Sequence, residues 1–521
     1  MKTPRKFFYP VVAAIMVIFG LYLGVNLQPK VDMKRASKFE EVLVALEEKY
    51  VDSVNKDVLF NDAINEMLHK LDPHSRYISK DNLLKEQQEM QGSFGGIGVR
   101  FQRINDTVCV ILSMQNGPAY KAGIRNGDQI LSINGNPFIG SKISNDMVME
   151  KLRGEQNSPV SVKILRDKKI LEINIIRGEI ALETIDAYFM VDSKMGYLKI
   201  NQFSVSTYEE FQRATKELLN MGMQTLILDL RGNPGGVLDV AVAIADEFLE
   251  EGEIIVSVKG KAIANRTDYA TSGGMLENTK LAVLIDESSA SAAEILAGAI
   301  QDNDRGMLYG RRTFGKGLVQ QDQILRDGSS VRMTISRYYT PSGRTIQRSY
   351  EGDYDSYVRD ESRFRKGELF YEDSIPIDRS KPFKTKKGRT VYGGGGIVPD
   401  VFVPYDSSDV SVLTSMLLTH QVFSAYVFGY LKTKKNPWNS VQSLQRYVFS
   451  EAEWKNFESL AQNQLKINDL RLLLRQDKRN LIAYLKEEFS RQIWQESNQI
   501  RFLLGRDQEM NSALKNEKLR L

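Results

Sequence analysis

The sequence predicts an α/β protein with a β-rich domain ahead of its main core and helical segments at both ends. Three observations support this prediction. From residue 179 onwards, apolar runs of strand length alternate with amphipathic helical runs. Short β-prone stretches separated by glycine turns fill residues 92–178. Apolar residues recur at helical spacing in residues 31–91 and 408–521.

The composition is that of a globular protein and argues against nucleic-acid binding and against a cysteine-rich metal site. The chain has 521 residues, of which 42% are hydrophobic, enough for about three or four domains. Its 70 basic and 66 acidic residues nearly balance, so no nucleic-acid partner is expected. The single cysteine, Cys109, excludes an intramolecular disulfide and a cysteine-rich metal site.

Residues 1–30 predict a membrane anchor. Three basic residues precede an uncharged run from Phe7 to Leu27, which is long enough to span a bilayer as a helix. The basic flank places the N-terminus in the cytoplasm and the remaining chain outside it. A cleaved signal peptide is the competing interpretation. The absence of a clear small-x-small site and the length of the run favour the uncleaved anchor.

The helical stretch of residues 31–91 contains the turn Leu71-Asp72-Pro73-His74-Ser75. His74 has two interpretations, a catalytic residue or a hydrogen-bonded turn residue, and we favour the second. In the β-rich domain, a glycine-rich run, Gly95-Gly96-Ile97-Gly98-Val99, precedes the strand pattern. By itself such a run is a flexible hinge or a loop that offers backbone N–H groups to a ligand.

The α/β region begins with a strand at residues 195–200 and a helix at 207–221. A buried strand at 225–230 then leads through Arg231-Gly232-Asn233-Pro234-Gly235-Gly236 to a helix at 237–250. Glycines at a strand-to-helix junction make either a plain turn or a source of exposed N–H groups, which favour negative charge.

A serine-rich turn marks the candidate nucleophile. The strand Leu281–Ile285 is followed by Ser288-Ser289-Ala290-Ser291 and by a helix from Ala292 to Ile300. A serine close to a helix N-terminus is well placed to act as a nucleophile, because the helix end favours developing negative charge. Ser291 with Glu294 is also a capping box, which requires no chemistry.

Lys316 is the candidate base. It lies between Gly315 and Gly317, where a desolvated lysine could lose its proton. The alternative is an ordinary surface lysine. The three histidines, His69, His74 and His420, are distant in sequence from Ser291, which favours lysine over a Ser-His-Asp triad.

These segments resemble the C-terminal processing peptidases, also called tail-specific proteases. The matching motifs are Ser-Ala-Ser-Ala-x-Glu at residues 289–294 and Thr-Phe-Gly-Lys-Gly at 313–317. The resemblance implies Ser291 as nucleophile, Lys316 as base and Gln320 as the residue that orients the lysine. It also implies that Gly235 or Gly236, with the backbone N–H of Ala292, forms an oxyanion hole.

The resemblance further implies a crotonase-like, Clp-protease-like stack of ββα units and a PDZ domain. In the PDZ domain, Gly95, Gly96, Ile97, Gly98 and Val99 would bind the terminal carboxylate of a substrate. The predicted domain layout is as follows: anchor 1–30, helical segment 31–91, PDZ domain 92–178, peptidase core 179–407 and helical domain 408–521.

Two regions depart from the family pattern. The family's Gly-Ile-x-Pro-Asp run follows soon after the turn at residues 339–344, but here it comes only at 396–400. We therefore interpret residues 348–392 as an insertion, either a surface excursion or an element of substrate access. The helical domain resembles no assigned segment. It either docks on the core or binds another subunit or an adaptor protein.

The function implied is a serine endopeptidase that cleaves proteins near their C-termini through an acyl-enzyme. No metal or cofactor is implied, and the substrates are proteins or peptides with free C-termini. The implied location is a bacterial inner membrane, spanned once, with the catalytic domain in the periplasm. The rivals are a PDZ scaffold with an inactive protease domain and a crotonase-type acyl-CoA enzyme. Intact Ser291, Lys316 and glycine elements argue against the first, and the PDZ-like insertion and the Ser–Lys pair argue against the second.

Overall fold

The computed structural model describes residue 16 and residues 33–516, apart from residues 141, 262, 407–410, 435, 468, 469 and 495. The predicted anchor, Phe7–Leu27, thus lies outside the described residues except for residue 16. The chain divides into two compact units, Met1–Leu71 and Asp72–Leu521.

Within the described ranges, no single helix is long and apolar enough to cross a membrane. Taken together, the neighbouring helices α12 (Val412–Thr419) and α13 (Val422–Thr433) have the length and apolar composition of a membrane span, and the pair is bent by 57°. Both helices contribute buried side chains, such as Leu417 and Val427, to a helical core.

The first unit contains two helices, α2 (Met33–Lys49) and α3 (Lys56–His69). Helix α3 begins where the Asn55 side chain accepts the backbone N–H groups of Asp57 and Val58, which satisfies two of the free donors at a helix start.

The second unit begins with a short strand, β1 (Arg76–Ile78), and a helix, α4 (Lys80–Gln91). The turn before β1 is held by Asp72, whose carboxylate accepts the N–H groups of His74 and Ser75. The turn interpretation of this segment is therefore confirmed.

The β-rich domain is an antiparallel sheet in the order β3-β4-β5-β7-β8, with the short β6 (Asn136–Pro137) paired to β5. Its strands are β3 (Val99–Ile104), β4 (Thr107–Ser113), β5 (Gln129–Ile133), β7 (Pro159–Arg166) and β8 (Lys169–Ile176). Helices α5 (Pro118–Ala122) and α6 (Asn145–Leu152) contribute to its core. Strand β3 lies at one edge of the sheet, so one of its sides is not paired within it.

A separate two-stranded ribbon joins this domain to the α/β core. Strand β2 (Ser93–Gly96) pairs antiparallel with β9 (Gly178–Ala181). The glycines Gly95 and Gly96, predicted to lie in a loop, are therefore part of a strand, and the loop is confined to Ile97 and Gly98 between β2 and β3. The pairing explains the difference, because the partner strand is remote in sequence.

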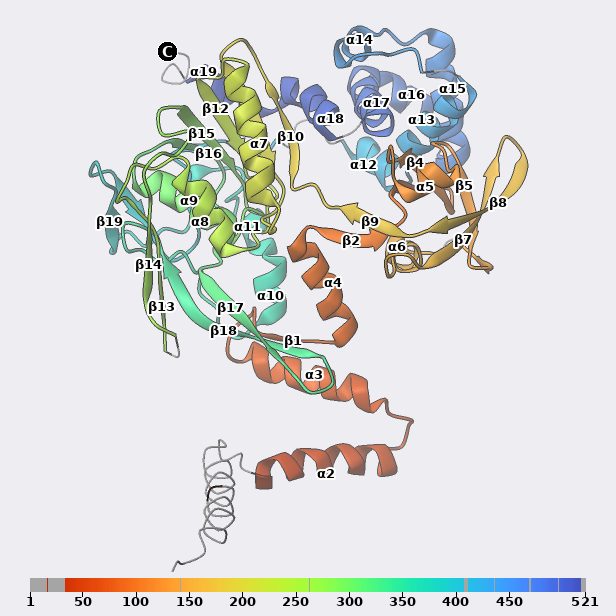
Figure 1. Ribbon diagram of the computed structural model, residues 1–521. Helices are drawn as coiled ribbons and strands as arrows, with labels where there is room; N and C mark the ends of the chain where they lie inside the picture. Colours follow the sequence, from red (N-terminus) through yellow and green to blue (C-terminus); the bar gives the residue numbers. More distant parts are fainter. Residues whose placement is uncertain are drawn as a thin grey trace, which may run out of the picture. The chain divides into compact units, whose positions relative to one another are not determined.

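The α/β core is a six-stranded sheet in the order β10-β11-β12-β15-β16-β21, parallel except between β10 and β11 (Figure 1). Its strands are β10 (Ile185–Met190), β11 (Met195–Ile200), β12 (Thr225–Asp229), β15 (Lys280–Ile285), β16 (Met307–Gly310) and β21 (Val401–Phe402). Because β12, β15 and β16 are neighbouring parallel strands, the loops after them emerge at the same edge. These loops carry Gly235 and Gly236, Ser291, and Lys316, respectively.

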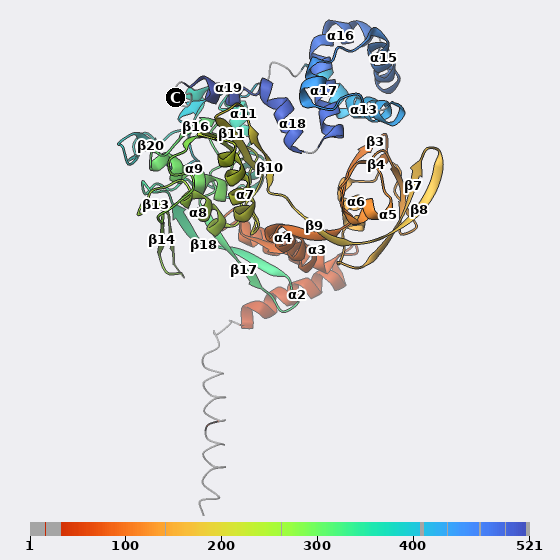
Figure 2. The ribbon, with the colours of Figure 1, turned by 45° about the horizontal axis from the view of Figure 1, so that its top comes forward.

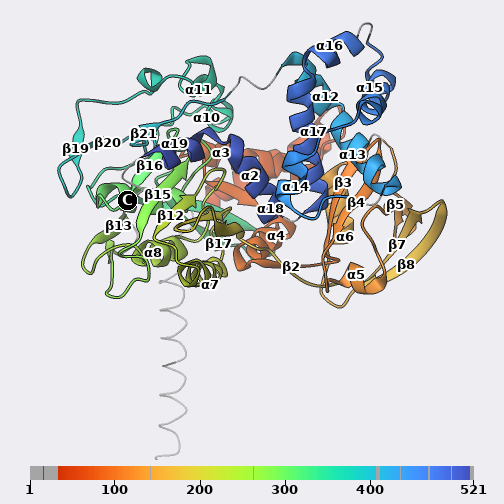
Figure 3. The same cartoon turned by 90° about the horizontal axis from the view of Figure 1, so that it is seen from above.

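Alternating side chains bury the two faces of this sheet in different cores. One face packs on helices α7 (Thr207–Asn220), α8 (Leu238–Asp246) and α9 (Ala292–Asp302). The other face packs on α19 (Gln508–Lys515), through Met510 and Ala513. Figure 3 shows α7 and α8 on one side of the sheet and α19 on the other.

A second sheet flanks the core, in the order β1-β18-β13-β14, with β17 also paired to β18. Its further strands are β13 (Ile254–Gly260), β14 (Arg266–Tyr269), β17 (Leu318–Ile324) and β18 (Ser330–Tyr339). Strand β1 thereby places His74 near the strands that follow Lys316.

The predicted insertion, 348–392, consists of short helices and strands joined by loops. They are α10 (Tyr354–Arg359), α11 (Glu361–Arg365), the 3-10 turn η2 (Glu372–Ser374), β19 (Pro382–Lys384) and β20 (Thr390–Tyr392). The two strands pair with each other as a hairpin.

The C-terminal region forms a helical cluster with its own aromatic core, including Phe423, Trp454 and Phe489. After α12 and α13, its helices are α14 (Val441–Arg446), α15 (Glu451–Leu465), α16 (Leu470–Gln476) and α17 (Lys478–Ile493), and α18 (Glu496–Leu503) leads to α19. Figure 2 shows α13 beside β3 and β4 of the β-rich domain. Phe428 of α13 packs there with Ile104, Cys109 and Ile111.

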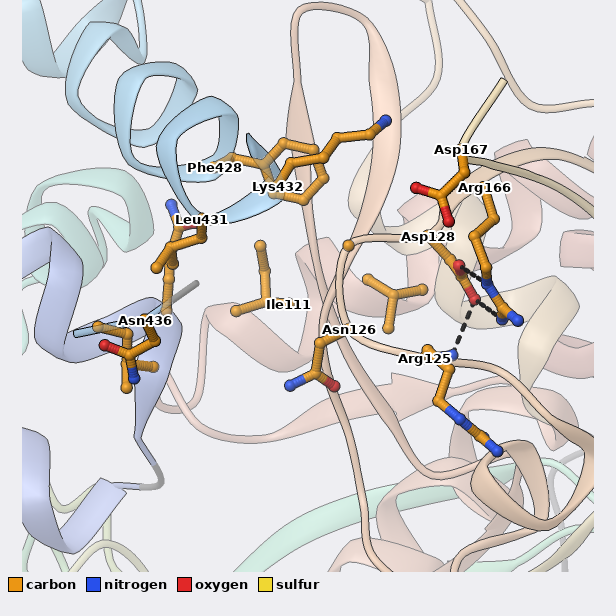
Figure 4. Close-up of a pocket in the computed structure, with 14 residues that line it drawn as sticks. Ile111, Arg125, Asn126, Asp128, Arg166, Asp167, Phe428, Leu431, Lys432 and Asn436 are labelled. Carbon is orange, nitrogen blue, oxygen red and sulfur yellow. Dashed lines mark hydrogen bonds and ion pairs between the residues drawn. The ribbon is translucent and has the colours of Figure 1, made fainter. Parts of the chain in front are cut away.

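A cavity of about 360 Å³ lies at this junction, lined by strand ends of the β-rich domain and by α13 (Figure 4). In it the buried Asp128 pairs with Arg166 at 2.6 Å, and Phe428, Leu431 and Lys432 line the cavity from α13. None of the residues predicted for catalysis lines this cavity.

Candidate active site

Ser291 lies at a strained turn between β15 and α9. Its backbone angles are φ 54° and ψ −114°, in a region that non-glycine residues rarely adopt. Holding a residue there costs about 1–3 kcal/mol, and such strain concentrates at functional sites. The helix that follows, α9, is buried along its whole length, so the surrounding packing can hold this turn in place.

A buried carboxylate joins the serine turn to the lysine loop. Glu294 has no exposed surface, and its Oε2 accepts the backbone N–H groups of Ser291 at 2.9 Å and Lys316 at 2.8 Å. Its Oε1 accepts the N–H of Gly315 at 2.7 Å and the hydroxyl of Thr313. Burial raises the pKa of Glu294 to about 7, although all four donors favour the charged form. Glu294 therefore sets the position of one segment against the other.

Lys316 lines a cavity of about 370 Å³ together with Ser291, Gln320 and Gly236. Burial, followed by the positive charges of Arg332 and Arg76, lowers the pKa of Lys316 to about 8. At pH 7 about a tenth of the molecules then carry a neutral lysine, whereas an ordinary lysine is almost wholly protonated. Lys316 is thus able to accept a proton near neutral pH.

Gln320 enters the same cavity from β17, and its Nε2 donates to the backbone carbonyl of His74 at 2.6 Å. Among the described residues, no hydrogen bond joins the Lys316 ammonium to Ser291 or Gln320. Catalytic hydrogen bonds commonly tighten only when substrate binds. The structure brings the three residues together without joining them directly.

The two glycines proposed for the oxyanion hole differ in their backbone contacts. The N–H of Gly235 donates to the Asn233 side chain at 2.8 Å. The N–H groups of Gly236 and Ala292 have no acceptor in the part of the chain that the structure describes. Gly235 instead provides room: a Cβ atom there would lie 2.7 Å from the Cβ of Ser291. The geometry therefore favours Gly236 over Gly235 as the donor.

The sequence analysis missed Tyr338 of β18. Its buried hydroxyl donates to the backbone carbonyl of Lys316 and lies 3.1 Å from the carbonyl oxygen of Ser291. Burial raises the pKa of Tyr338 well above its ordinary value, so the hydroxyl stays protonated. A tyrosine in a β-prone run gives no sign of this role in the sequence.

His74 also lies nearer to the site than the sequence suggested. Its Nε2 is 3.1 Å from the hydroxyl of Tyr357, and it lines a second cavity with Lys316. Burial, followed by the charge of Lys316, lowers the pKa of His74 to about 3. His74 is therefore neutral at physiological pH.

An ion network fixes the start of the glycine loop. Asp229 at the end of β12 is buried and holds Arg231 at 2.5 Å, and Arg231 also pairs with Asp507 at 2.7 Å. Glu509 on α19 bonds both Arg231 and Arg311, the residue after β16. The C-terminal helix thus helps to position two of the three loops at the active edge.

No cluster of three or more His, Cys, Asp or Glu side chains suited to a metal ion occurs among the described residues.

A family model described as Peptidase family S41 matches residues 194–356, and one described as PDZ domain matches residues 95–176. The chain is 34% identical over 321 residues to a carboxy-terminal-processing protease of Bartonella bacilliformis, covering 60% of this chain and 73% of that protein. It belongs to peptidase family S41.

Other members of the family are similar to a comparable extent. A probable CtpA-like serine protease of Staphylococcus aureus strain MRSA252 is 33% identical over 343 residues, which is 64% of this chain and 68% of that protein. Among solved structures, the photosystem II D1 C-terminal processing protease shows 26% identity and a TM-score of 0.37, covering 70% of this chain and 92% of that one. The two family models and the two relatives above show that the chain is a serine protease of the carboxy-terminal processing family with a PDZ domain.

In the PDZ domain of this S41 peptidase, local packing gives a reason for glycine at positions 95 and 96 that is independent of the predicted carboxylate binding. A Cβ atom on Gly95 would lie 2.0 Å from the carbonyl oxygen of Gly154, and one on Gly96 would lie 2.8 Å from the ring of Phe94. Packing therefore requires both glycines, whether or not a carboxylate binds there. Gly98 has φ +72°, which suits glycine at the turn into the edge strand β3.

Proposed function

We propose that this S41 peptidase is a Ser–Lys endopeptidase that cleaves proteins near their C-termini. The observation that carries the proposal is a single cavity that holds both Ser291 and a lysine whose pKa is lowered to about 8. The tether through Glu294 supports it, because this carboxylate binds the backbone of both residues.

In the proposed reaction, Ser291 Oγ attacks the scissile carbonyl carbon while neutral Lys316 accepts the hydroxyl proton. The N–H groups of Gly236 and Ala292 stabilise the oxyanion. The Lys316 ammonium then gives the proton to the leaving amine, and an acyl-enzyme remains. Lys316 next takes a proton from water, which attacks the ester and releases Ser291. Gln320 orients the lysine.

The PDZ domain is proposed to bind the free C-terminus of a protein or peptide substrate at Gly95–Val99. The unpaired side of β3 supports this assignment, because a peptide can add to an edge strand by backbone hydrogen bonds. The N–H groups of the loop that precedes β3 would receive the carboxylate.

Several broader features remain proposals. We propose that the peptidase core has the crotonase-like, Clp-protease-like fold and that the domains follow the predicted boundaries. We also propose an uncleaved anchor at Phe7–Leu27, a bacterial inner-membrane location and a periplasmic catalytic domain. The helical regions are proposed to bind a second copy or an adaptor protein. An intact N-terminus on protein that stays in the membrane fraction after a high-salt wash would support the anchor, and a soluble protein starting near residue 30 would refute it.

The test of the function uses an unfolded protein as substrate and compares the wild type with Ser291→Ala and Lys316→Arg. Both variants should fold and lose cleavage, because alanine has no nucleophile and arginine cannot lose its proton. Ser272→Ala, at an exposed serine away from the cavity, serves as the control and should cleave normally. Cleavage retained by Lys316→Arg would exclude Lys316 as the base.

A further inference from the structure

A second cavity adjoins the one that holds Ser291. Its volume is about 680 Å³, and Pro234 and Lys316 line both cavities. A substrate bound with its scissile bond at Ser291 therefore has a second recess within reach of its neighbouring residues. Lys316 and His74 both line this recess.

The insertion contributes about half of the residues that line this recess. Helices α10 and α11 contribute Val358 and Phe364, whose surfaces are 50% and 59% exposed. Leu369 of the insertion and Phe314 of the lysine loop complete an apolar lining. Large apolar side chains with this much exposure next to a catalytic lysine indicate a surface that binds something.

Most of the charged residues around the recess form ion pairs with neighbouring side chains. Asp360 pairs with Arg348, and Glu361 pairs with Arg365. The buried Arg363 pairs with Glu368, and Glu287 pairs with Arg311. A charged substrate group placed there would lose hydration and gain little in return. Among the described residues that line the recess, Lys316 and the exposed Arg359 of α10 make no ion pair, and these cations make an acidic side chain the alternative occupant.

The part of the insertion that lines the recess is held by hydrogen bonds and ion pairs to the loop that carries Lys316. Glu368 bonds Arg312 through both oxygens at 2.8 Å, and Arg363 donates to the backbone carbonyls of Arg312 and Thr313. The guanidinium of Arg348 lies over the rings of Phe314 and Tyr357, at 4.3 and 4.0 Å from their centres. The recess is therefore formed before substrate arrives, which lowers the cost of binding.

We propose that the insertion forms a specificity pocket that accepts a large apolar side chain of the substrate close to the scissile bond. The proposal rests on the proposed endopeptidase function and names its substrate preference. The S41 family match ends at residue 356, so Val358, Phe364 and Leu369 lie beyond it. The preference is thus set in part by residues outside the stretch that matches the family model.

The experiment maps cleavage sites in an unfolded protein by mass spectrometry. The wild type should show Leu, Phe or Met enriched at one fixed position near the cleaved bond. Phe364→Ser should lower that enrichment about tenfold, since losing contact with a hydrophobic pocket changes kcat/KM by roughly 10–200-fold. Val358→Ser is measured in parallel, because Phe364 also packs on Phe370 at 5.3 Å and its loss could disturb the helix. Tyr371→Ser, equally exposed in the insertion but outside the recess, is the matched control and should keep the wild-type profile.

The outcomes separate the pocket from the function. If the wild type shows no cleavage that depends on Ser291, the endopeptidase function fails. If it cleaves, but both pocket variants keep the wild-type profile, only the pocket is refuted. An enrichment of Asp or Glu that is lost in Arg359→Gln would also refute the apolar pocket and assign the recess to acidic side chains.

Discussion

Replacing Arg332 by glutamine should move the pH dependence of catalysis to higher pH. Arg332 is one of the cations that lower the pKa of Lys316, and it pairs with Asp322 at 2.7 Å and with Glu86 at 2.7 Å. Removing it takes a positive charge away and leaves two carboxylates without that partner. Both changes favour the protonated lysine, so the pKa of Lys316 must rise.

The size of the effect follows from the pKa of about 8. One nearby charge shifts a pKa by on the order of one unit. The neutral fraction of Lys316 at pH 7 would fall from about 9% to about 1%, so kcat/KM should fall about ninefold. At pH 10 the lysine is mostly neutral in both proteins, and their rates should nearly agree.

The assay is kcat/KM for an internally quenched peptide from pH 6 to 10, with circular dichroism at each pH to verify folding. Arg337→Gln, which removes an exposed cation from the same strand, is the control and should leave the profile in place. If Arg332→Gln lowered kcat/KM equally at every pH, or shifted the pH profile towards acid, Lys316 could not be a base whose pKa is set by its charged neighbours.

Three further results are expected. Lys316→Met should stabilise the fold by about 3 kcal/mol at pH 7 in urea denaturation, because the pKa of this lysine is about 8 in the folded protein and 10.5 ordinarily, so folding carries the full penalty below pH 8. The gain should fade as the pH rises from about 8 to 10.5, and a gain that is independent of pH would contradict the argument. Glu294→Gln should lower kcat at least about tenfold with a smaller change in KM, since an amide cannot accept all four hydrogen bonds; an unchanged kcat would show that the tether is dispensable. A peptide with a free C-terminus should be cleaved about tenfold faster than its amide, because an amide loses a charge-assisted bond in the PDZ loop; equal rates would remove the proposed role of that loop.

The strongest sequence patterns predicted their elements closely. The strand expected at 195–200 is β11, the helix expected at 207–221 is α7, and the strand expected at 281–285 forms most of β15. In each, periodic apolar residues face a core that the pattern itself specifies. The helix expected at 237–250 ends earlier, at Asp246, because Phe248 and Leu249 enter the core from a turn and extend the apolar pattern beyond it.

Pairings between distant segments could not be predicted. Strand β17, Leu318–Ile324, is polar and owes its structure to pairing with β18, not to side-chain burial. The glycines of β2 have low strand propensity, and they pair with β9, which follows the PDZ domain in the sequence. Local motifs indicated Ser291 and Lys316, but Tyr338 and His74 approach them only through the second sheet.

The packing of α19 limits how this enzyme can be shortened. A fragment cut to the extent of its likeness to other S41 peptidases would end well before Asp507. Such a fragment would leave Arg231 and Arg311 without the acidic partners on and just before α19, and would open the apolar sheet face around Tyr197 to water. We therefore expect α19, a helix with no catalytic motif, to be needed for a stable peptidase core.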